Sequence, residues 1–476
     1  MSEKFYVTTS IAYVNAPPHI GFALESVQAD VLARFYRQSG KDVYFLTGTD
    51  EHGAKIARAA EEAGATPEKL TDNLSGKFKN LKKALNLSWD NFVRTSDQKA
   101  HWPVAQEIWN MILKAGDLEQ KIYKGLYCVG CEAFITEKDL VNGKCAIHQT
   151  APEKIEEKNW FFKLSKYGKE LEKKIKSDEL KIVPESRKNE VLSFLKEGLD
   201  DVSFSRPSKD LKWGVPVPGD DTQTMYVWAD ALTNYISGYG GIKAWEKHPA
   251  DIHIIGKDIL RFHAIIWPAM LLSAKLSLPK NIYVHGFITV DRQKMSKSLG
   301  NTISPFDLVE MYKGADAVRY FLLREIPSSE DGDFNYIKFK ERYNGDLANG
   351  IGNFASRVST LACKEKELEY KKSSLKYVEL VENNLNNFSI DKALVAIMDL
   401  VRYGDGIMAA EKPWDKAVTE QNRRKCLSAL ASILYDSANL LNPFLPETSE
   451  KILENMEIKG KKIIVKKKIE NLFPRL

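Results

Sequence analysis

Along the first 85 residues, apolar positions switch between the short runs typical of strands and the wider spacing typical of helices. Residues 4–15 are rich in β-branched and aromatic side chains, and a helical pattern follows over residues 21–38. The apolar run at residues 42–46 is typical of a buried parallel strand, and helical patterns begin again near His52 and Thr66. This alternation predicts a parallel α/β sheet with nucleotide-binding geometry at its strand ends.

The alternation stops near residue 117 and resumes with predicted strands at residues 252–255 and 282–288, separated by a helix that begins at Asp258. Beyond residue 335, helical patterns over residues 345–361, 377–388 and 391–410 dominate, joined by a lysine-rich connection at 364–376. We therefore expect a Rossmann-like parallel-sheet domain in two parts, residues 1–116 and 211–335. An insertion over residues 117–210 separates the parts, and an all-helical bundle over residues 336–476 follows.

Composition places the chain among ordinary globular proteins. Of its 476 residues, 43% are hydrophobic and 28% are charged, and 69 Lys and Arg against 64 Asp and Glu give a net charge of +5. These values exclude a disordered, collagen-like or disulfide-rich protein. The longest apolar run, residues 264–272, is shorter than the ~18 residues that a membrane span needs. No signal peptide is visible, so we expect a cytoplasmic protein without a membrane partner. The lysine cluster at residues 459–468 is typical of a solvated surface and, less often, of a nucleic-acid contact.

Three of the five cysteines cluster in the insertion. Cys128 and Cys131, followed after thirteen residues by Cys145 and then by His148, give the pattern C-x2-C-x13-C-x2-H. Two close ligand pairs separated by a loop suit tetrahedral zinc, and a Cys3His set leaves no open coordination position. We expect a structural zinc knuckle, with a metal-free remnant as the alternative. The isolated Cys363 and Cys426 are predicted to be buried small hydrophobes.

Two short segments carry phosphate-binding chemistry. His19-Ile20-Gly21 lies where the first strand leads into the first helix, where free backbone N–H groups favour phosphate, Gly21 permits close approach and His19 can donate a hydrogen bond. Lys294-Met295-Ser296-Lys297-Ser298 follows a late strand and forms a cationic loop suited to a triphosphate. Taken alone, the first segment could arise by chance and the second could be a solvated basic turn.

Together, these segments resemble the paired ATP-binding motifs of class I aminoacyl-tRNA synthetases. Residues 47–53 (TGTDEHG), 225–235 (MYVWADALTNY), 256–263 (GKDILRFH) and 284–286 (VHG) extend the resemblance to the methionyl-tRNA synthetase family over nearly the whole chain. The resemblance implies that His19, Lys294 and Lys297 are catalytic and bind ATP with Gly21, Gly256 and Asp258. It also implies that Asp50 holds the methionine α-ammonium. The residues expected to contact the methionine side chain are Ile11, Tyr13, Trp228, Ala231, Tyr235, Ile259, Phe262 and His263.

The spacing of these residues is consistent with that reading. Ile259, Phe262 and His263 would share one face of a helix, and Trp228, Ala231 and Tyr235 would share one face of another. An aromatic pocket suits a thioether, which gains ~0.3–1.5 kcal/mol from sulfur–aromatic contacts. Without the resemblance, such stripes would more often be plain core. Asp50 and Asp258 could likewise act only as helix caps.

The resemblance further implies a two-step reaction with ATP and Mg²⁺. Methionine would attack the α-phosphate of ATP to give methionyl-adenylate and pyrophosphate, and the methionyl group would pass to the 2′-hydroxyl of the terminal adenosine of tRNA(Met), including initiator tRNA. No general base is identifiable. In the helical region, Asn353 and Arg357 would read an anticodon base and Trp414 would stack on another. The alternative there is a surface hydrogen bond and a core tryptophan.

The sequence departs from the family pattern at Phe22, where a second His is usual, and Ala54 replaces a residue that is often polar. A lost phosphate donor can cost ~2.7–4 kcal/mol, so a catalytically weakened tRNA-binding paralogue is one alternative. Synthetases for leucine, valine or isoleucine would need a larger editing insertion, and a cysteine-activating relative would place zinc in its pocket. With no room for a C-terminal dimerisation domain after Leu476, we expect a monomer.

Overall fold

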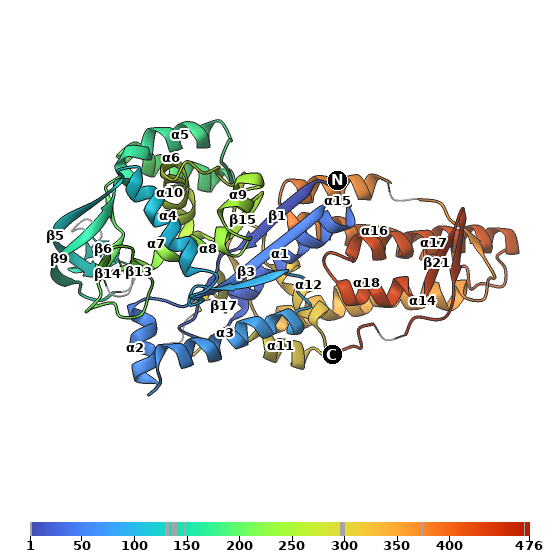
Figure 1. Ribbon diagram of the computed structural model, residues 1–476. Helices are drawn as coiled ribbons and strands as arrows, with labels where there is room; N and C mark the ends of the chain where they lie inside the picture. Colours follow the sequence, from blue (N-terminus) through green and yellow to red (C-terminus); the bar gives the residue numbers. More distant parts are fainter. Residues whose placement is uncertain are drawn as a thin grey trace. The chain divides into compact units, whose positions relative to one another are not determined.

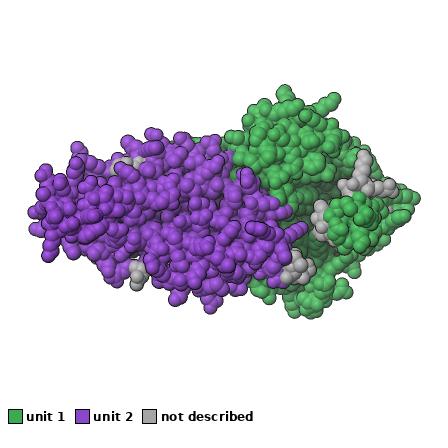
Figure 2. Space-filling model, turned by 180° about the vertical axis from the view of Figure 1, so that it is seen from behind, with its two compact units in different colours: residues 1–18, 41–82, 89–284 green, residues 19–40, 83–88, 285–476 purple. Residues whose placement is uncertain are grey.

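The protein is described here from a computed structural model that covers residues 2–128, 133–135, 140–146, 149–295, 300–372, 375–470 and 472–476. The chain divides into two compact units (Figure 2). Unit 1 comprises residues 1–18, 41–82 and 89–284, and unit 2 comprises residues 19–40, 83–88 and 285–476. The chain thus passes between the units several times. Each unit is described separately.

Unit 1 contains the predicted parallel sheet. Its strand order is β10-β16-β15-β1-β3-β2, with β4 also paired to β3. In the centre, β1 (Lys4–Thr9) lies between β3 (Asp42–Asp50) and β15 (Ile252–Gly256), and both pairings are parallel (Figure 1). The outer strands are β2 (Ala12–Tyr13), β4 (Asn91–Arg94), β16 (Asn281–His285) and β10 (Lys181–Val183). Because β1, β3 and β15 run the same way, their carboxyl ends, which carry residues 9–13, 50 and 256, meet at one edge.

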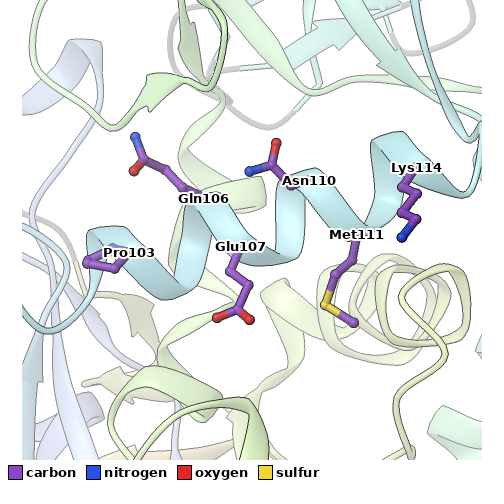
Figure 3. Close-up of a pocket in the computed structure, with 6 residues that line it drawn as sticks. All are labelled: Pro103, Gln106, Glu107, Asn110, Met111 and Lys114. Atoms are coloured by element: carbon purple, nitrogen blue, oxygen red, sulfur yellow. The ribbon is translucent and has the colours of Figure 1, made fainter.

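The helices of unit 1 include α2 (Ala54–Glu62), α3 (Pro67–Ala84) and α4 (Trp102–Lys114). Helix α4 is amphipathic: Ala105, Ile108, Trp109 and Ile112 are buried in the core that also contains Tyr6 and Leu46. The residues on its other face line a surface pocket of about 440 Å³ (Figure 3). All six lining residues belong to this one helix, so no predicted site residue lines the pocket.

The predicted insertion forms a second sheet with order β11-β9-β5-β6. Its long antiparallel pair is β5 (Leu118–Cys128) with β9 (Glu153–Phe162), flanked by β6 (Ala133–Ile135) and β11 (Val202–Ser203). Helices α5 (Gly168–Lys176) and α6 (Glu185–Glu197) follow β9. Between them, β10 pairs with β16 of the main sheet, so the insertion is tied back to that sheet.

Unit 2 is mainly helical. It contains α1 (Ile20–Gln38), α11 (Pro305–Met311), α12 (Ala315–Glu325), α13 (Tyr336–Arg342) and α14 (Asn353–Ala362), with a π-helix at Tyr343–Gly352. Helices α15 (Leu375–Asn386), α16 (Ile390–Glu411), α17 (Glu420–Leu441) and α18 (Pro446–Leu453) complete the bundle, in which α16 lies beside α17 (Figure 1). The predicted helices over residues 345–361, 377–388 and 391–410 are therefore confirmed within a few residues.

A fully buried ion pair joins α1 to α12. A guanidinium nitrogen of Arg319 lies 2.7 Å from Oδ2 of Asp30, and the same group donates to the backbone carbonyls of Leu85, Pro443 and Phe444. Burial opposes the charge of Asp30, but Arg319 and Arg34 outweigh it and hold the pKa of Asp30 below its usual value. Removing either partner would leave an uncompensated buried charge.

Three features differ from the sequence expectation. The helical region is not purely α, because β20 (Leu368–Glu369), β22 (Lys462–Val465) and β21 (Met456–Lys459) form a small sheet. The buried side chains of Leu368 and Ile463 explain it, since lysines around them hide the alternation. The strand predicted at residues 282–288 is two strands, β16 and β17 (Ile288–Val290). Across the described ranges, no helix has both the length and the apolar character to cross a bilayer.

Candidate active site

His19 is the N-cap of α1. Its Nδ1 accepts a hydrogen bond from the backbone N–H of Gly21 at 3.1 Å, so at neutral pH the ring proton resides on Nε2. Burial lowers the pKa of His19, which favours the neutral ring. A Cβ at position 21 would lie 2.8 Å from Cε1 of His19, so the absence of a side chain at Gly21 makes room for this cap. The helix start thus offers one imidazole N–H together with the backbone N–H groups of its first turn.

The second predicted motif follows a β-hairpin of unit 2. Strands β17 and β18 (Gln293–Lys294) are joined by Asp291 and Arg292, which both have positive φ, as a two-residue type I′ turn requires. Asp333 holds the hairpin by accepting from the Thr289 hydroxyl at 2.6 Å and from the Arg292 backbone N–H at 2.7 Å. The side chain of Lys294 is exposed at the end of β18. Lys297 lies outside the described residues, and its role stays a prediction.

Unit 2 brings the two motifs together. The backbone N–H of Ile20 donates to the carbonyl of Ile303 at 3.1 Å, just beyond the lysine loop. The terminal methyl of Met295 lies 3.8 Å from the position that a Cβ on Gly21 would occupy. Segments separated by 275 residues (294 − 19) in the sequence are therefore neighbours, as two motifs that bind one nucleotide must be.

The predicted methionine site lies in unit 1. Asp50 is the last residue of β3, is 5% exposed, and pairs in register with Tyr13 of β2. The backbone carbonyl of Asp50 accepts from the N–H of Val14 at 3.1 Å. Helix α2 begins after Gly53, which has no side-chain cap, so Asp50 is not the cap of that helix. Ile11, Tyr13, Trp228, Ile259 and Phe262 all pack against the large core of the unit and remain partly exposed.

Aromatic side chains form the opposite part of this predicted pocket. The rings of Trp228 and Phe262 stack with centroids 3.7 Å apart, and His263 meets the Trp228 ring edge-on at 6.3 Å. Trp228 and Ala231 lie on α7 (Val227–Ala231), whereas Tyr235 lies on the separate helix α8 (Asn234–Ser237). The expected single helix is thus broken. Ile259 ends a 3₁₀ turn and Phe262 begins a π-helix, so the second expected α-helix is also irregular here.

His263 has a defined hydrogen-bonding state. Its Nδ1 lies 3.0 Å from the carbonyl of Ile259, and its Nε2 lies 2.7 Å from the hydroxyl of Tyr235. A carbonyl only accepts, so Nδ1 carries the proton and Nε2 accepts from the tyrosine. Burial lowers the pKa of His263 to about 4, and the ring is neutral at physiological pH. A neutral, apolar-facing pocket is compatible with an uncharged side chain such as a thioether.

Gly256 and Asp258 follow the strand next to β1. Gly256 ends β15, and Asp258 lies in the 3₁₀ turn Lys257–Ile259 with its side chain exposed. Asp258 is inside the turn and not at its N-cap, so the capping alternative does not apply. An exposed carboxylate here is able to accept from a hydroxyl group of a ligand.

Sequence reasoning gave no role to several buried polar residues around Asp50. Arg94 binds the carboxylate of Glu51 through two contacts of 2.8 Å, and the hydroxyls of Thr49, Ser75 and Ser96 also donate to it. The side chain of His52 binds Asp230, which also binds His101. His52 and Asp230 fall inside the quoted motifs, but nothing in their spacing shows that they meet.

The predicted zinc ligands are only partly described. Cys128 ends β5, Cys145 ends β8 (Lys144–Cys145), and both are buried in one small cluster with Leu126 and Leu140. Cys131 and His148 lie outside the described residues. In the part of the chain that the structure covers, no group of three or more His, Cys, Asp or Glu side chains could hold a metal. Two buried thiols in one cluster nevertheless fit one half of a zinc site.

The predicted anticodon residues meet in unit 2. Asn353 begins α14 and is exposed, and the guanidinium of Arg357, one turn later, lies 5.3 Å from the ring centroid of Trp414. Trp414 is 50% exposed and is therefore not a core tryptophan. Arg357 also lies 3.6 Å from Oδ1 of Asp405. An exposed indole beside an arginine is a surface on which a base can stack.

Comparison with known proteins agrees with this geometry. The family model "tRNA synthetases class I (M)" matches residues 5–145 and 135–359, and the model "Anticodon-binding domain of tRNA ligase" matches residues 373–474. The parallel sheet, the paired motifs and the helical domain thus define a class I tRNA synthetase.

The relatives narrow this class. The chain is 40% identical to the methionine–tRNA ligase of Brucella suis biovar 1, over 97% of this chain and 93% of that protein. It is 42% identical to that of Clostridium acetobutylicum, over 96% of this chain and 74% of that protein. A Mycobacterium tuberculosis methionyl-tRNA synthetase solved with methionyl-adenylate superposes with a TM-score of 0.90 at 39% identity, covering 95% and 94% of the two chains. The chain belongs to the methionine–tRNA ligase family. None of these likenesses supports a catalytically weakened paralogue.

Proposed function

We propose that the chain activates methionine with ATP and transfers the methionyl group from methionyl-adenylate to the 3′-terminal adenosine of tRNA(Met), for both initiation and elongation. The observation that carries this proposal is the contact between the two phosphate-binding motifs in unit 2. The Ile20–Ile303 hydrogen bond and the approach of Met295 to Gly21 join segments that have no reason to meet in a protein without a nucleotide site.

In the first step, the methionine carboxylate attacks the α-phosphate of ATP and pyrophosphate leaves. The neutral His19 donates from Nε2 to a phosphate oxygen, and Lys294 and Lys297 offset the charge of the leaving pyrophosphate. Gly21 and Gly256 allow close approach of the nucleotide, and Asp258 accepts from a ribose hydroxyl. A magnesium ion bound with ATP would add further neutralisation of the phosphates.

The amino acid is selected by charge at one end and by shape at the other. Asp50 pairs with the α-ammonium, so an amino acid without a free amino group is rejected. Tyr235 and His263, linked through the 2.7 Å hydrogen bond, present no net charge to the side chain. The remaining contacts are made by Ile11, Tyr13, Trp228, Ala231, Ile259 and Phe262.

Transfer RNA is bound through the helical domain. Asn353 and Arg357 hydrogen-bond to one anticodon base, and Trp414 stacks on another, a contact worth ~1–3 kcal/mol. The catalytic domain comprises residues 1–116 and 211–335, the connective insertion 117–210 and the anticodon-binding domain 336–476. Cys128, Cys131, Cys145 and His148 hold a structural zinc ion that takes no part in the chemistry. The enzyme acts as a cytoplasmic monomer.

The test is amino-acid-dependent exchange of pyrophosphate into ATP, measured with each of the twenty amino acids, followed by tRNA charging. Exchange with methionine alone is expected. The variant Trp414→Ala should keep exchange within about twofold while charging at limiting tRNA falls by about 10-fold or more, the ratio expected from one lost stacking contact.

Exchange with a different amino acid would contradict the pocket assignment. No exchange with any amino acid, in a protein that still binds tRNA, would contradict the enzyme proposal. Phe22→His would then show whether the missing second histidine is the reason. An equal loss of exchange and charging in Trp414→Ala would contradict the separate role of the helical domain.

A further inference from the structure

Two histidines and an aspartate form a buried hydrogen-bonded chain in unit 1. Oδ2 of Asp230 lies 2.6 Å from Nδ1 of His52, and Oδ1 lies 2.7 Å from Nε2 of His101. Nδ1 of His101 in turn lies 2.8 Å from the hydroxyl of Ser237. Asp230 and His101 are fully buried and His52 is 1% exposed, so water does not compete for these bonds. Buried polar chains of this kind are costly unless every bond is kept.

The chain joins four segments that are distant in sequence. His52 lies just after β3, His101 is the residue before α4, Asp230 lies on α7 and Ser237 ends α8. The apolar face of α4 is packed in the core, and its outer face lies at the surface (Figure 3), so the helix that follows His101 is firmly seated. One carboxylate therefore sets the spacing between the end of a central strand and two short helices.

The hydrogen-bonding states follow from the chemistry of the carboxylate. Burial alone would raise the pKa of Asp230, but His52 and His101 outweigh it and lower that pKa, so the group is ionised. An ionised carboxylate only accepts, so Nδ1 of His52 and Nε2 of His101 are both donors. Nε2 of His52 has no hydrogen-bond partner among the described residues. The ring is otherwise held only by edge contacts with Trp102 and Trp213, so its hydrogen bond to Asp230 fixes its orientation.

The residue between Asp50 and His52 is anchored independently. Glu51 is fully buried and is bound by Arg94 through both carboxylate oxygens. Its backbone N–H also donates to the hydroxyl of Thr95 at 2.9 Å. The two residues that follow Asp50 are therefore held by different elements, Glu51 by β4 and His52 by α7 and α4.

We propose that Asp230, through His52 and His101, is a positioning residue of the amino-acid site. It holds Asp50, two residues before His52, at a fixed distance from Trp228, two residues before Asp230 itself. The inference rests on the proposed roles of Asp50 at the ammonium end and of Trp228 at the side-chain end. Asp230 touches neither substrate nor ATP in this proposal; it fixes the length of the pocket that methionine must span.

The experiment compares Asp230→Asn with the unchanged protein in steady-state pyrophosphate exchange. An Asn side chain keeps the shape but presents an amide N–H to one of the two donor histidines, so one buried hydrogen bond is lost. The KM for methionine should rise by ~10- to ~100-fold, as expected for a misplacement of about 1 Å, while the KM for ATP stays within about twofold. Methionine binding without ATP, followed by tryptophan fluorescence, should weaken by the same factor.

Asp117→Asn is the matched control. Asp117 is another buried carboxylate of unit 1, with Lys166 and Ser273 each at 2.8 Å and the hydroxyl of Tyr167 as a third partner, and the proposal gives it no part in catalysis. Both variants should lower the thermal unfolding midpoint, and only Asp230→Asn should change the KM for methionine. A variant Asp230→Asn that is destabilised like Asp117→Asn but keeps the methionine KM would overturn the proposal.

Two further variants keep the result interpretable. If Asp230→Asn does not fold, His101→Leu and His101→Gln replace it: glutamine can still donate to Asp230 and leucine cannot, so only the leucine variant should raise the methionine KM. Equal methionine KM values in these two variants would count against the proposal. Asp50→Asn, measured in parallel, separates the two levels. If it leaves the methionine KM unchanged, the proposed ammonium site is wrong; if it alone raises that KM, only the positioning role is wrong.

Discussion

At the scale of single residues, His19 combines two tasks that usually compete. A capping side chain must accept a hydrogen bond from the helix, whereas a phosphate ligand must donate one. The imidazole does both because its two nitrogens differ: Nδ1 accepts from Gly21, which leaves the proton on Nε2. A doubly protonated ring would lose the cap, and burial, by lowering the pKa of His19, disfavours that state.

This division of tasks predicts different outcomes for two substitutions. His19→Ala removes both bonds, and the maximal rate of pyrophosphate exchange should fall by ~10²–10³-fold, the usual effect of one lost transition-state donor. His19→Asn can still cap through Oδ1 and donate through Nδ2, so it should retain more activity than the alanine variant. Loss of the cap costs about 1 kcal/mol, so urea unfolding should show only a small loss of stability in His19→Ala. Equal rates for both variants would show that the donor function of His19 is unimportant.

At the scale of elements, the long strand β5 and the short β8 each end in a buried cysteine. This placement predicts that purified protein contains about one equivalent of zinc, since two such ends supply half of a tetrahedral site. Cys145→Ser should lower the zinc content measured by atomic emission and lower the thermal midpoint. Methionine-dependent exchange at low temperature should persist, because the ion is structural.

Cys363→Ser is the control for this experiment, because Cys363 lies at the end of α14, away from the predicted ligand set. It should keep the zinc content of the unchanged protein. A protein that binds no zinc when folded in its presence, and whose thermal midpoint is the same with and without a chelator, would contradict the prediction of a zinc site.

The elements also show what sequence patterns can predict. Helix α1 and strands β3 and β15 follow from periodicity, because each is long or wholly apolar. The break between α7 and α8 does not: residues 228, 231 and 235 have ideal helical spacing, and the chain nevertheless leaves the helix at Leu232 and Thr233. Tertiary hydrogen bonds decide here, including that of the Thr233 hydroxyl to the carbonyl of Asp230 at 2.7 Å.

The candidate site divides in the same way. The phosphate motifs, Asp50 and the aromatic residues could be proposed from the sequence because a family pattern marks them. The chain of His52, Asp230 and His101 could not, because its members are separated by up to 178 residues (230 − 52) and no local rule relates them. An aspartate within the otherwise apolar segment around Trp228 was the available signal, since a buried carboxylate requires partners.

At the scale of the whole molecule, stability depends on every group whose pKa changes on unfolding. Burial lowers the pKa of His263 to about 4, and burial together with His263 lowers that of His253 well below its usual value. In the unfolded chain both rings titrate near 6.5. Above that pH they are neutral in both states and cost nothing; as the pH falls from 6.5 towards 4, only the unfolded chain takes up protons, and stability is lost.

We therefore expect the free energy of unfolding, measured with urea, to decrease between pH 6.5 and pH 4.5, with His263 alone contributing up to roughly 3 kcal/mol over its full window. Carboxylates with lowered pKa values, such as Asp30, act only at lower pH, and Asp316, whose pKa is raised by burial, acts in the opposite direction. The variant His253→Gln separates these contributions, because glutamine can bond Thr8 and Trp267 as His253 does but does not titrate. Its stability should fall less steeply over the same interval, whereas parallel curves for the variant and the unchanged protein would show that His253 does not control this slope.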